Sequence, residues 1–130
     1  MVERKTYVIF IAGPFRGLNA WEIEKNIRNA EGWGLDLMLG AEAQEDFGIA
    51  ALIPHTLYRF FQGAAPDRVW LDADLELLRR CDGALFIPGW ENSHGAGVER
   101  TECAHRGIPT YYSIGEALSQ TRMRAAGAIA

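Results

Sequence analysis

The sequence Tyr7-Val-Ile-Phe-Ile-Ala12, followed at once by Gly13-Pro14, decides the fold. The run is continuously apolar and rich in β-branched and aromatic residues, without alternation of polar and apolar side chains. This pattern is typical of a strand that is covered on both faces, as strands are in parallel sheets. The run therefore predicts a buried first strand of a parallel sheet, which ends at the Gly-Pro pair.

The rest of the chain alternates between helix and strand patterns. Asn19 and Glu22 form a capping box that predicts the start of a helix with an expected end within 38–46. Ser113 and Glu116 form a second capping box, which predicts a C-terminal helix. Further strands are predicted at 49–53, 84–88 and 109–112, further helices at 67–80 and 95–106, a left-handed helix end at Gly107, and an irregular loop at 55–66.

This order of elements predicts a doubly wound α/β fold, with a mainly parallel Rossmann-like (flavodoxin-like) sheet of four to five strands flanked by helices. The chain has 130 residues, of which 48% are hydrophobic and 23% are charged. This length and composition fit one domain over 1–130, because two separate cores are improbable at this size.

The composition also disfavours several classes of function. Thirteen basic residues are scattered against 17 acidic ones, for a net charge of -4, which disfavours binding to long nucleic acids. No apolar run approaches the roughly 18 to 20 residues that a membrane span needs. Cys81 and Cys103 lack CxxC spacing and are expected to be reduced core thiols, which favours a cytoplasmic location.

Three loops are predicted to border a ligand site. In doubly wound sheets, ligands bind at the carboxyl ends of the strands. That rule selects the loops at 13–18, 54–66 and 89–97, and Gly13 begins the first of them. We expect the substrate to be bound between these loops.

Asp74 is a candidate catalytic residue because of its place in the helix predicted at 67–80. Helical spacing puts it within an apolar stripe that includes Trp70, Leu71 and Leu78. Desolvating a carboxylate is unfavourable unless something on that face requires it. The alternative is that Asp74 lies at the edge of the stripe and caps a neighbouring loop.

The glycines that precede the fourth helix suggest a phosphate site. Gly95 and Gly97 let backbone N–H groups approach a ligand, and a helix N-terminus favours an anion. Ser93 adds a hydroxyl donor, and Arg16 adds a forked cation from the first loop. A plain turn explains the glycines equally well, since neither GxxxxGK[ST] nor GxGxxG is present.

Glu99 is the second candidate catalytic residue. We expect it in the first turn of the helix at 95–106, facing the sheet beside Ala96 and Cys103 and held ionised by the helix N-terminus. Together with Asp74 it would supply a nucleophile and an acid/base group. The alternative is that Glu99 only complements the helix dipole, and Glu102 is the neighbouring acid that must be distinguished from it.

No metal or other cofactor is expected. The histidines at 55, 94 and 105 do not form a ligand set at a recognised spacing. Three aromatic residues fall in the predicted site loops, where they can stack on a planar base, although such residues in small domains are more often part of the core. They are Phe15, Tyr58 and Trp90.

Three blocks of sequence, in order and spacing, resemble the nucleoside 2-deoxyribosyltransferase-like family, which includes nucleoside 5'-monophosphate N-glycosidases. The blocks are FIAGPFRG at 10–17, DLELLRRCD at 74–82 and GWENSHGAGVE at 89–99. With the connecting elements the resemblance covers roughly 7–118. It implies a Rossmann-like fold, no cofactor, and homodimers or larger assemblies.

The resemblance also implies roles for individual residues. Glu99 would attack the anomeric carbon of a nucleoside sugar and form a glycosyl-enzyme intermediate. Asp74 would hold the sugar and nucleophile region or help to protonate the departing base. In the branch that acts on monophosphates, Ser93 and Arg16 match residues that bind the 5'-phosphate.

The chain departs from the family pattern at two positions. Phe10 stands where many members carry a tyrosine, so that hydroxyl is absent. Pro14 follows Gly13 where the monophosphate hydrolases have Gly-Ser, which removes one phosphate donor. The segment that contains His55 and Tyr58 is a candidate replacement for the missing contacts.

The expected function is hydrolysis or transfer at the N-glycosidic bond of a nucleoside or nucleoside 5'-monophosphate. The phosphate cradle favours hydrolysis of a nucleotide. A non-catalytic nucleotide-binding sensor module is the alternative. A flavodoxin-like electron carrier is less well supported, because the sequence contains no flavin-specific loop.

Overall fold

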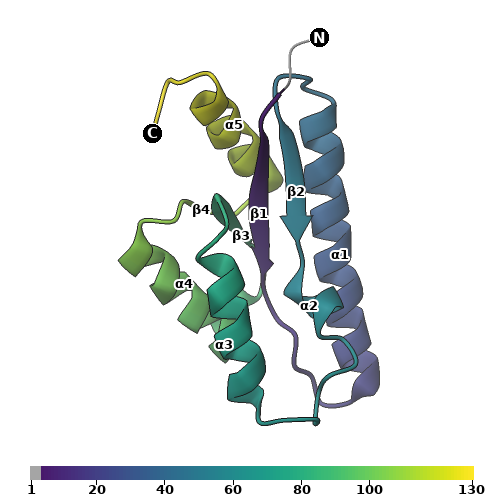
Figure 1. Ribbon diagram of the computed structural model, residues 1–130. Coiled ribbons are helices and arrows are strands. Elements are labelled where there is room, and N and C mark those ends of the chain that lie inside the picture. Colours follow the sequence, from purple (N-terminus) through teal and green to yellow (C-terminus); the bar gives the residue numbers. More distant parts are fainter. Residues whose placement is uncertain (1–3) are drawn as a thin grey trace.

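The computed structural model describes residues 4–130, so residues 1–3 of the predicted domain lie outside the described part. It contains a parallel sheet of four strands in the order β2-β1-β3-β4 (Figure 1). This confirms the predicted doubly wound α/β fold. The strands are β1 (Thr6–Ala12), β2 (Gly48–Leu52), β3 (Gly83–Phe86) and β4 (Thr110–Tyr111).

The apolar run of β1 forms the centre of the molecule. Phe10 pairs with Leu52 of β2 on one side and with Ala84 of β3 on the other. Ile9 and Ile11 belong to one buried cluster, whereas Phe10 belongs to a second cluster. Because β1 contributes to both cores, its run needs apolar residues at every position.

The helices form a layer on each face of the sheet (Figure 1). On one face α1 contacts α5, and on the other α3 contacts α4. Together with the single turn α2 and the short 3₁₀ helix η1, their bounds are α1 (Ala20–Glu42), α2 (Pro54–Leu57), α3 (Asp67–Leu78), η1 (Trp90–Asn92), α4 (His94–Arg106) and α5 (Ile114–Ala125).

The predicted helix ends are confirmed where a side chain caps the backbone. Asn19 accepts a hydrogen bond from the Glu22 N–H at 3.0 Å, and Ser113 accepts one from the Glu116 N–H at 3.1 Å. The last helical residue of α1, Glu42, falls within the predicted interval. Gly107 ends α4 in the left-handed conformation, with φ of 67°.

Some predicted bounds were wrong. The segment 55–66 is not wholly irregular, since Pro54 begins the helical turn α2; its ring fixes φ, and its lack of an N–H is harmless at a first helical position. The strands predicted at 84–88 and 109–112 are shorter, because β4 pairs only through Thr110 and Tyr111. The helix predicted to start at Gly95 begins at His94, since Ser93 caps it.

Candidate functional site

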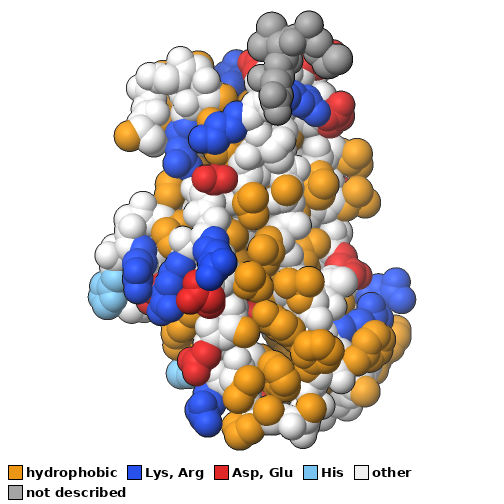
Figure 2. Space-filling view, viewed as in Figure 1, with side chains coloured by type: hydrophobic (Ala, Val, Ile, Leu, Met, Phe, Trp, Pro, Cys, Tyr) orange, Lys and Arg blue, Asp and Glu red, His pale blue; other side chains and the backbone are white. Residues whose placement is uncertain are grey.

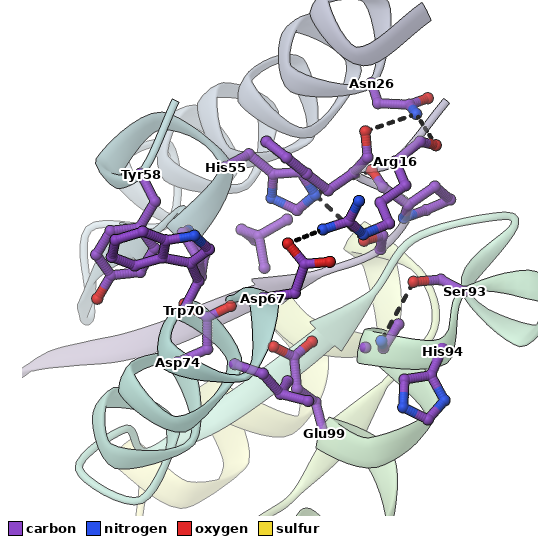
Figure 3. A pocket seen from close by; sticks show the side chains of 18 of the residues that line it. Arg16, Asn26, His55, Tyr58, Asp67, Trp70, Asp74, Ser93, His94 and Glu99 are labelled. Atoms are coloured by element: carbon purple, nitrogen blue, oxygen red, sulfur yellow. Dashed lines mark hydrogen bonds and ion pairs between the residues drawn. The ribbon is translucent and has the colours of Figure 1, made fainter. Parts of the chain in front are cut away.

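A cavity of about 810 Å³ lies at the carboxyl ends of β1 and β3. We call it the central cavity (Figure 3). All three predicted loops contribute to its wall, together with α3 and the first turns of α4. Its location follows the rule for ligand sites in doubly wound sheets.

Asp74 and Glu99 meet in this cavity. Asp74 comes from α3 and Glu99 from α4, and the packing of the two helices brings their carboxyl groups within a side-chain hydrogen bond of each other. Glu99 is only 5% exposed and lies on the buried face of α4 with Ala96 and Cys103, as predicted. Figure 3 shows both carboxyl groups directed into the site.

The environment raises the pKa of both carboxyl groups. Burial raises the pKa of Asp74 to about 7, although the hydrogen bond with Glu99 partly opposes that shift. Burial also holds the pKa of Glu99 well above its usual range, and the neighbouring charge of Asp74 adds to the effect. Two groups coupled in this way release their protons as a pair, and one proton stays between them over a wide range of pH.

The prediction that the helix N-terminus keeps Glu99 ionised was wrong. Because α4 begins at His94, Glu99 lies beyond its first turn, where the helix dipole acts only weakly. Burial and the second carboxyl group dominate instead.

The predicted phosphate cradle is present only in part. Ser93 Oγ accepts a hydrogen bond from the Ala96 N–H at 3.2 Å, and the Gly97 N–H is bonded to the Ser93 carbonyl at 3.0 Å. Gly97 lies outside the wall of the central cavity, so its position does not support the prediction that it binds substrate there. The backbone N–H groups of His94 and Gly95 remain as donors, because the first N–H groups of a helix have no acceptor within the helix.

Arg16 lines the central cavity but has a protein partner. Its guanidinium forms an ion pair with Asp67, the first residue of α3, which also lines the cavity (Figure 3). Both side chains are more than half exposed. No sequence signal marked Asp67 as a site residue, because an acid at a helix start is equally well explained by the helix dipole.

His55 connects α2 to the first loop. The buried ring donates through Nε2 to the carbonyl oxygens of Gly13 at 3.2 Å and Pro14 at 3.1 Å, which it reaches as a fork. Burial lowers the pKa of His55, so the ring is neutral at pH 7 with an unprotonated Nδ1. Gly13 itself lines the cavity, and a Cβ there would lie 2.3 Å from Ile87 Cγ1. Glycine therefore lets the loop pass close to Ile87, the residue after β3.

The aromatic residues divide between the cavity and the core. Trp90 packs against Phe86 and Tyr112, at ring distances of 5.4 and 5.9 Å, and is outside the cavity wall. The prediction that Trp90 binds substrate is therefore not supported by its position. Tyr58 lines the cavity as predicted, and it stacks on Trp70, which the sequence analysis had assigned to the apolar stripe of the helix.

A family model described as DUF4406, a domain of unknown function, matches residues 7–112. The chain belongs to this family. None of the curated proteins compared with it is similar in sequence. Every residue that lines the central cavity lies within the matched segment. The cavity is thus a feature of the DUF4406 domain itself.

Other reactive groups of this DUF4406 chain do not suggest a competing site. Burial raises the pKa of Cys81 to about 11 and that of Cys103 to about 12, so both thiols stay protonated at neutral pH and are poor nucleophiles. Within residues 4–130, no three His, Cys, Asp or Glu side chains are grouped so that they could hold a metal ion. Within the same residues, no helix has the length and apolarity needed to span a membrane.

Proposed function

We propose that the protein cleaves or exchanges the N-glycosidic bond of a nucleoside or nucleoside 5'-monophosphate, with Glu99 as the nucleophile and Asp74 as the acid/base. One observation carries this proposal: the buried carboxyl group of Glu99 and the half-buried one of Asp74, from different helices, lie together and interact on the wall of a large cavity. Two carboxyl groups that flank a glycosidic bond are the usual equipment for its cleavage.

The singly protonated pair supplies both chemical species that the first step needs once its remaining proton lies on Asp74, which leaves Glu99 as the carboxylate. The Glu99 carboxylate attacks the anomeric carbon C1' of the sugar, and the bond from C1' to the base nitrogen breaks. The electron pair of that bond goes to the base, which receives the proton of Asp74. The products are the free base and a glycosyl ester on Glu99.

The second step restores the pair. Asp74, now ionised, takes a proton from a water molecule whose oxygen attacks C1'. The ester bond breaks, and its electrons return to the Glu99 carboxylate. A second base that attacks in place of water gives transfer, which is the alternative outcome of the same intermediate.

The arrangement of the cavity favours a nucleotide as the substrate and hydrolysis as the reaction. In Figure 3, Arg16 and Ser93 lie at one end of the site and Tyr58 at the other, with the two carboxyl groups between them. A phosphate near Arg16, Ser93 and the free N–H groups at the start of α4 would place the sugar over Glu99. Its charge would have to replace Asp67 as the partner of Arg16.

The same proposal includes self-association of the chain. Figure 2 shows hydrophobic side chains gathered over α2 and the adjoining end of α1. Large apolar residues here are strongly exposed: Trp21 in α1 is 68% exposed, Leu57 in α2 is 50% exposed, and Phe60, which follows α2, is 87% exposed. Contact with a second copy would remove this area from water. Light scattering that gives the mass of two or more chains supports this proposal, and a monomer at high concentration contradicts it.

The reaction is tested by incubating the protein with a panel of nucleosides and nucleotides and measuring released base by chromatography. We expect base release by the wild type and none above background by Glu99→Gln. Glu102→Gln is the matched control, because Glu102 lies on the same helix but pairs with Arg79 and Arg106. Equal rates for wild type and Glu99→Gln contradict the proposal. Nucleotide binding without base release, even with an added acceptor base, supports the sensor alternative.

A further inference from the structure

The central cavity concentrates buried polar atoms that have no partner. Within residues 4–130, six buried side-chain atoms lack a hydrogen-bond partner, and three of them belong to residues that line this cavity: His55 Nδ1, Trp70 Nε1 and Asp74 Oδ1. Buried polar groups in native proteins are nearly always paired, since leaving one unpaired is destabilising. The wall is therefore complementary to a ligand that carries its own polar atoms.

Trp70 differs from the other two residues in being a donor. An indole N–H can only donate, whereas a neutral His55 Nδ1 and Asp74 Oδ1 accept. The ligand must therefore present an acceptor to Trp70. The three atoms are held by α2 and α3, so the matching atoms of the ligand must be displayed on a rigid frame.

The surroundings of Trp70 favour a flat ligand. Its ring stacks on Tyr58 at 6.1 Å with an interplanar angle of 27°, and Phe61 packs against both rings at 5.6 and 5.8 Å. Tyr58 and Trp70 lie at the opposite end of the site from Arg16 and Ser93 in Figure 3. Trp70 also precedes Asp74 by one helical turn, so the two side chains lie on the same face of α3.

We propose that Trp70 is part of the subsite for the nucleobase, and that its Nε1–H donates a hydrogen bond to an acceptor atom of the base. This inference rests on the proposed function and adds a residue that selects the base. Because the electrons of the broken bond move onto the base, a donor at its edge stabilises the departing group more than the bound substrate. Trp70 selects bases that carry the acceptor atom, and it does not select them by the size of their ring.

The first test observes the indole N–H directly. The chain has four tryptophans, so a ¹⁵N-labelled sample gives four indole N–H signals, and the signal that Trp70→Phe lacks belongs to Trp70. Free purine and pyrimidine bases are then added to the wild-type protein. We expect at least one base to move the Trp70 signal downfield and to leave that of Trp90 in place. A base that binds without moving the Trp70 signal overturns the inference, as does the failure of every base to bind at millimolar concentration.

The second test compares each binding base with an analogue in which one ring nitrogen is replaced by C–H. For one position, we expect the wild type to bind the analogue about three- to tenfold more weakly, the range for one lost hydrogen bond. Trp70→Phe keeps an aromatic ring but loses the donor, so it should discriminate less than twofold. Trp90→Phe is the matched control and should discriminate like the wild type. Equal discrimination by Trp70→Phe and the wild type overturns the inference.

The two proposals fail separately in these experiments. Binding of a free base involves no bond cleavage, so it is independent of the roles of Glu99 and Asp74 as reacting groups. If Trp70 discriminates among bases but no glycoside is cleaved, the proposed reaction is wrong and the base subsite stands. If base is released but Trp70→Phe retains full discrimination, the reaction stands and the subsite is wrong.

Discussion

Glu99 and Glu102 lie on the same helix, less than one turn apart, and their surroundings differ sharply. Glu99 is buried against Asp74, and its pKa is held well above the usual range. Glu102 points outward, and its hydrogen bond with Arg79, aided by Arg106, lowers its pKa. The inner side of the α3–α4 pair thus raises the pKa of carboxyl groups, and the outer side lowers it. The comparison teaches that burial and partners, not residue type, determine what an acid on this helix can do.

The largest expected effect separates these two residues by activity. Glu99→Gln should lower kcat for base release by about a thousandfold or more, because the amide cannot form the glycosyl ester. Glu102→Gln should stay within about twofold of the wild type, since its carboxylate pairs with Arg79 and Arg106 and is not part of the cavity wall. Initial rates at saturating substrate measure both. A similar loss of kcat in both variants would mean that activity does not distinguish Glu99 in the cavity from Glu102 outside it.

The second-largest effect is expected for substitution of Asp74, the partner of Glu99. Asp74→Asn keeps the shape of the side chain but cannot give up a proton, so kcat should fall by about 10²- to 10³-fold, the range for a general acid. Asp72→Asn is the matched control, because Asp72 lies on the exposed face of the same helix. Substrates with a good leaving group should be affected less, since they depart without protonation. An unchanged ratio between good and poor leaving groups would contradict the role of Asp74 as the acid.

The raised pKa values predict the pH dependence of the reaction. The pair must lose one proton before either carboxyl group can attack, and the pKa of Asp74 is raised to about 7 by burial. We therefore expect kcat/KM to fall about tenfold for each pH unit below roughly pH 7. Glu102→Gln should retain this acidic limb. A profile that is flat down to pH 5 would show that the inner pair ionises like the outer acid.

Glu99→Gln should stabilise the folded protein at high pH although it lowers activity. A carboxyl group with a raised folded-state pKa binds more protons in the folded than in the unfolded protein, so stability falls as pH rises above the unfolded value. Glu99→Gln removes this penalty and should raise Tm at pH 8 by about 3 to 6 °C. Near pH 4 the difference should vanish, because the group is then protonated in both states. Thermal unfolding by circular dichroism at both pH values measures it, and a lower Tm for Glu99→Gln at pH 8 would contradict the burial argument.

The sequence alone predicted the sheet and the two acids for identifiable reasons. The apolar run of β1 has a strong local pattern, and Asn19 and Ser113 cap their helices through bonds that span only three residues. Asp74 was found because a charge interrupts an apolar stripe. Its pairing with Glu99 was a hypothesis about acid/base chemistry, which neither spacing nor the loop rule placed in space.

The parts that could not be predicted depend on contacts between distant segments. The raised pKa of Glu99 follows from the packing of α3 against α4, which no local pattern contains. Trp70 and Trp90 are both apolar side chains beside predicted site segments, yet Trp70 lines the cavity and Trp90 packs on Phe86. Helical spacing says which side chains share a face, but not whether that face meets a core or a cavity.

The smallest expected effect tests the outer edge of the site, where exposed charges should count for less than the buried pair. Asp67 occupies Arg16 in the protein without ligand, and an incoming phosphate must compete with it. Exposed ion pairs contribute only about 0.2 to 1 kcal/mol, so Asp67→Asn should tighten binding of a nucleoside monophosphate by about 1.5- to fivefold. Asp72→Asn removes the same charge from the opposite face of α3 and should change binding less. Calorimetry with the monophosphate and its uncharged nucleoside measures the effect, and only the monophosphate should gain affinity. An equal gain for the nucleoside would mean that the gain does not depend on the phosphate, and that Arg16 is not the group for which phosphate and Asp67 compete.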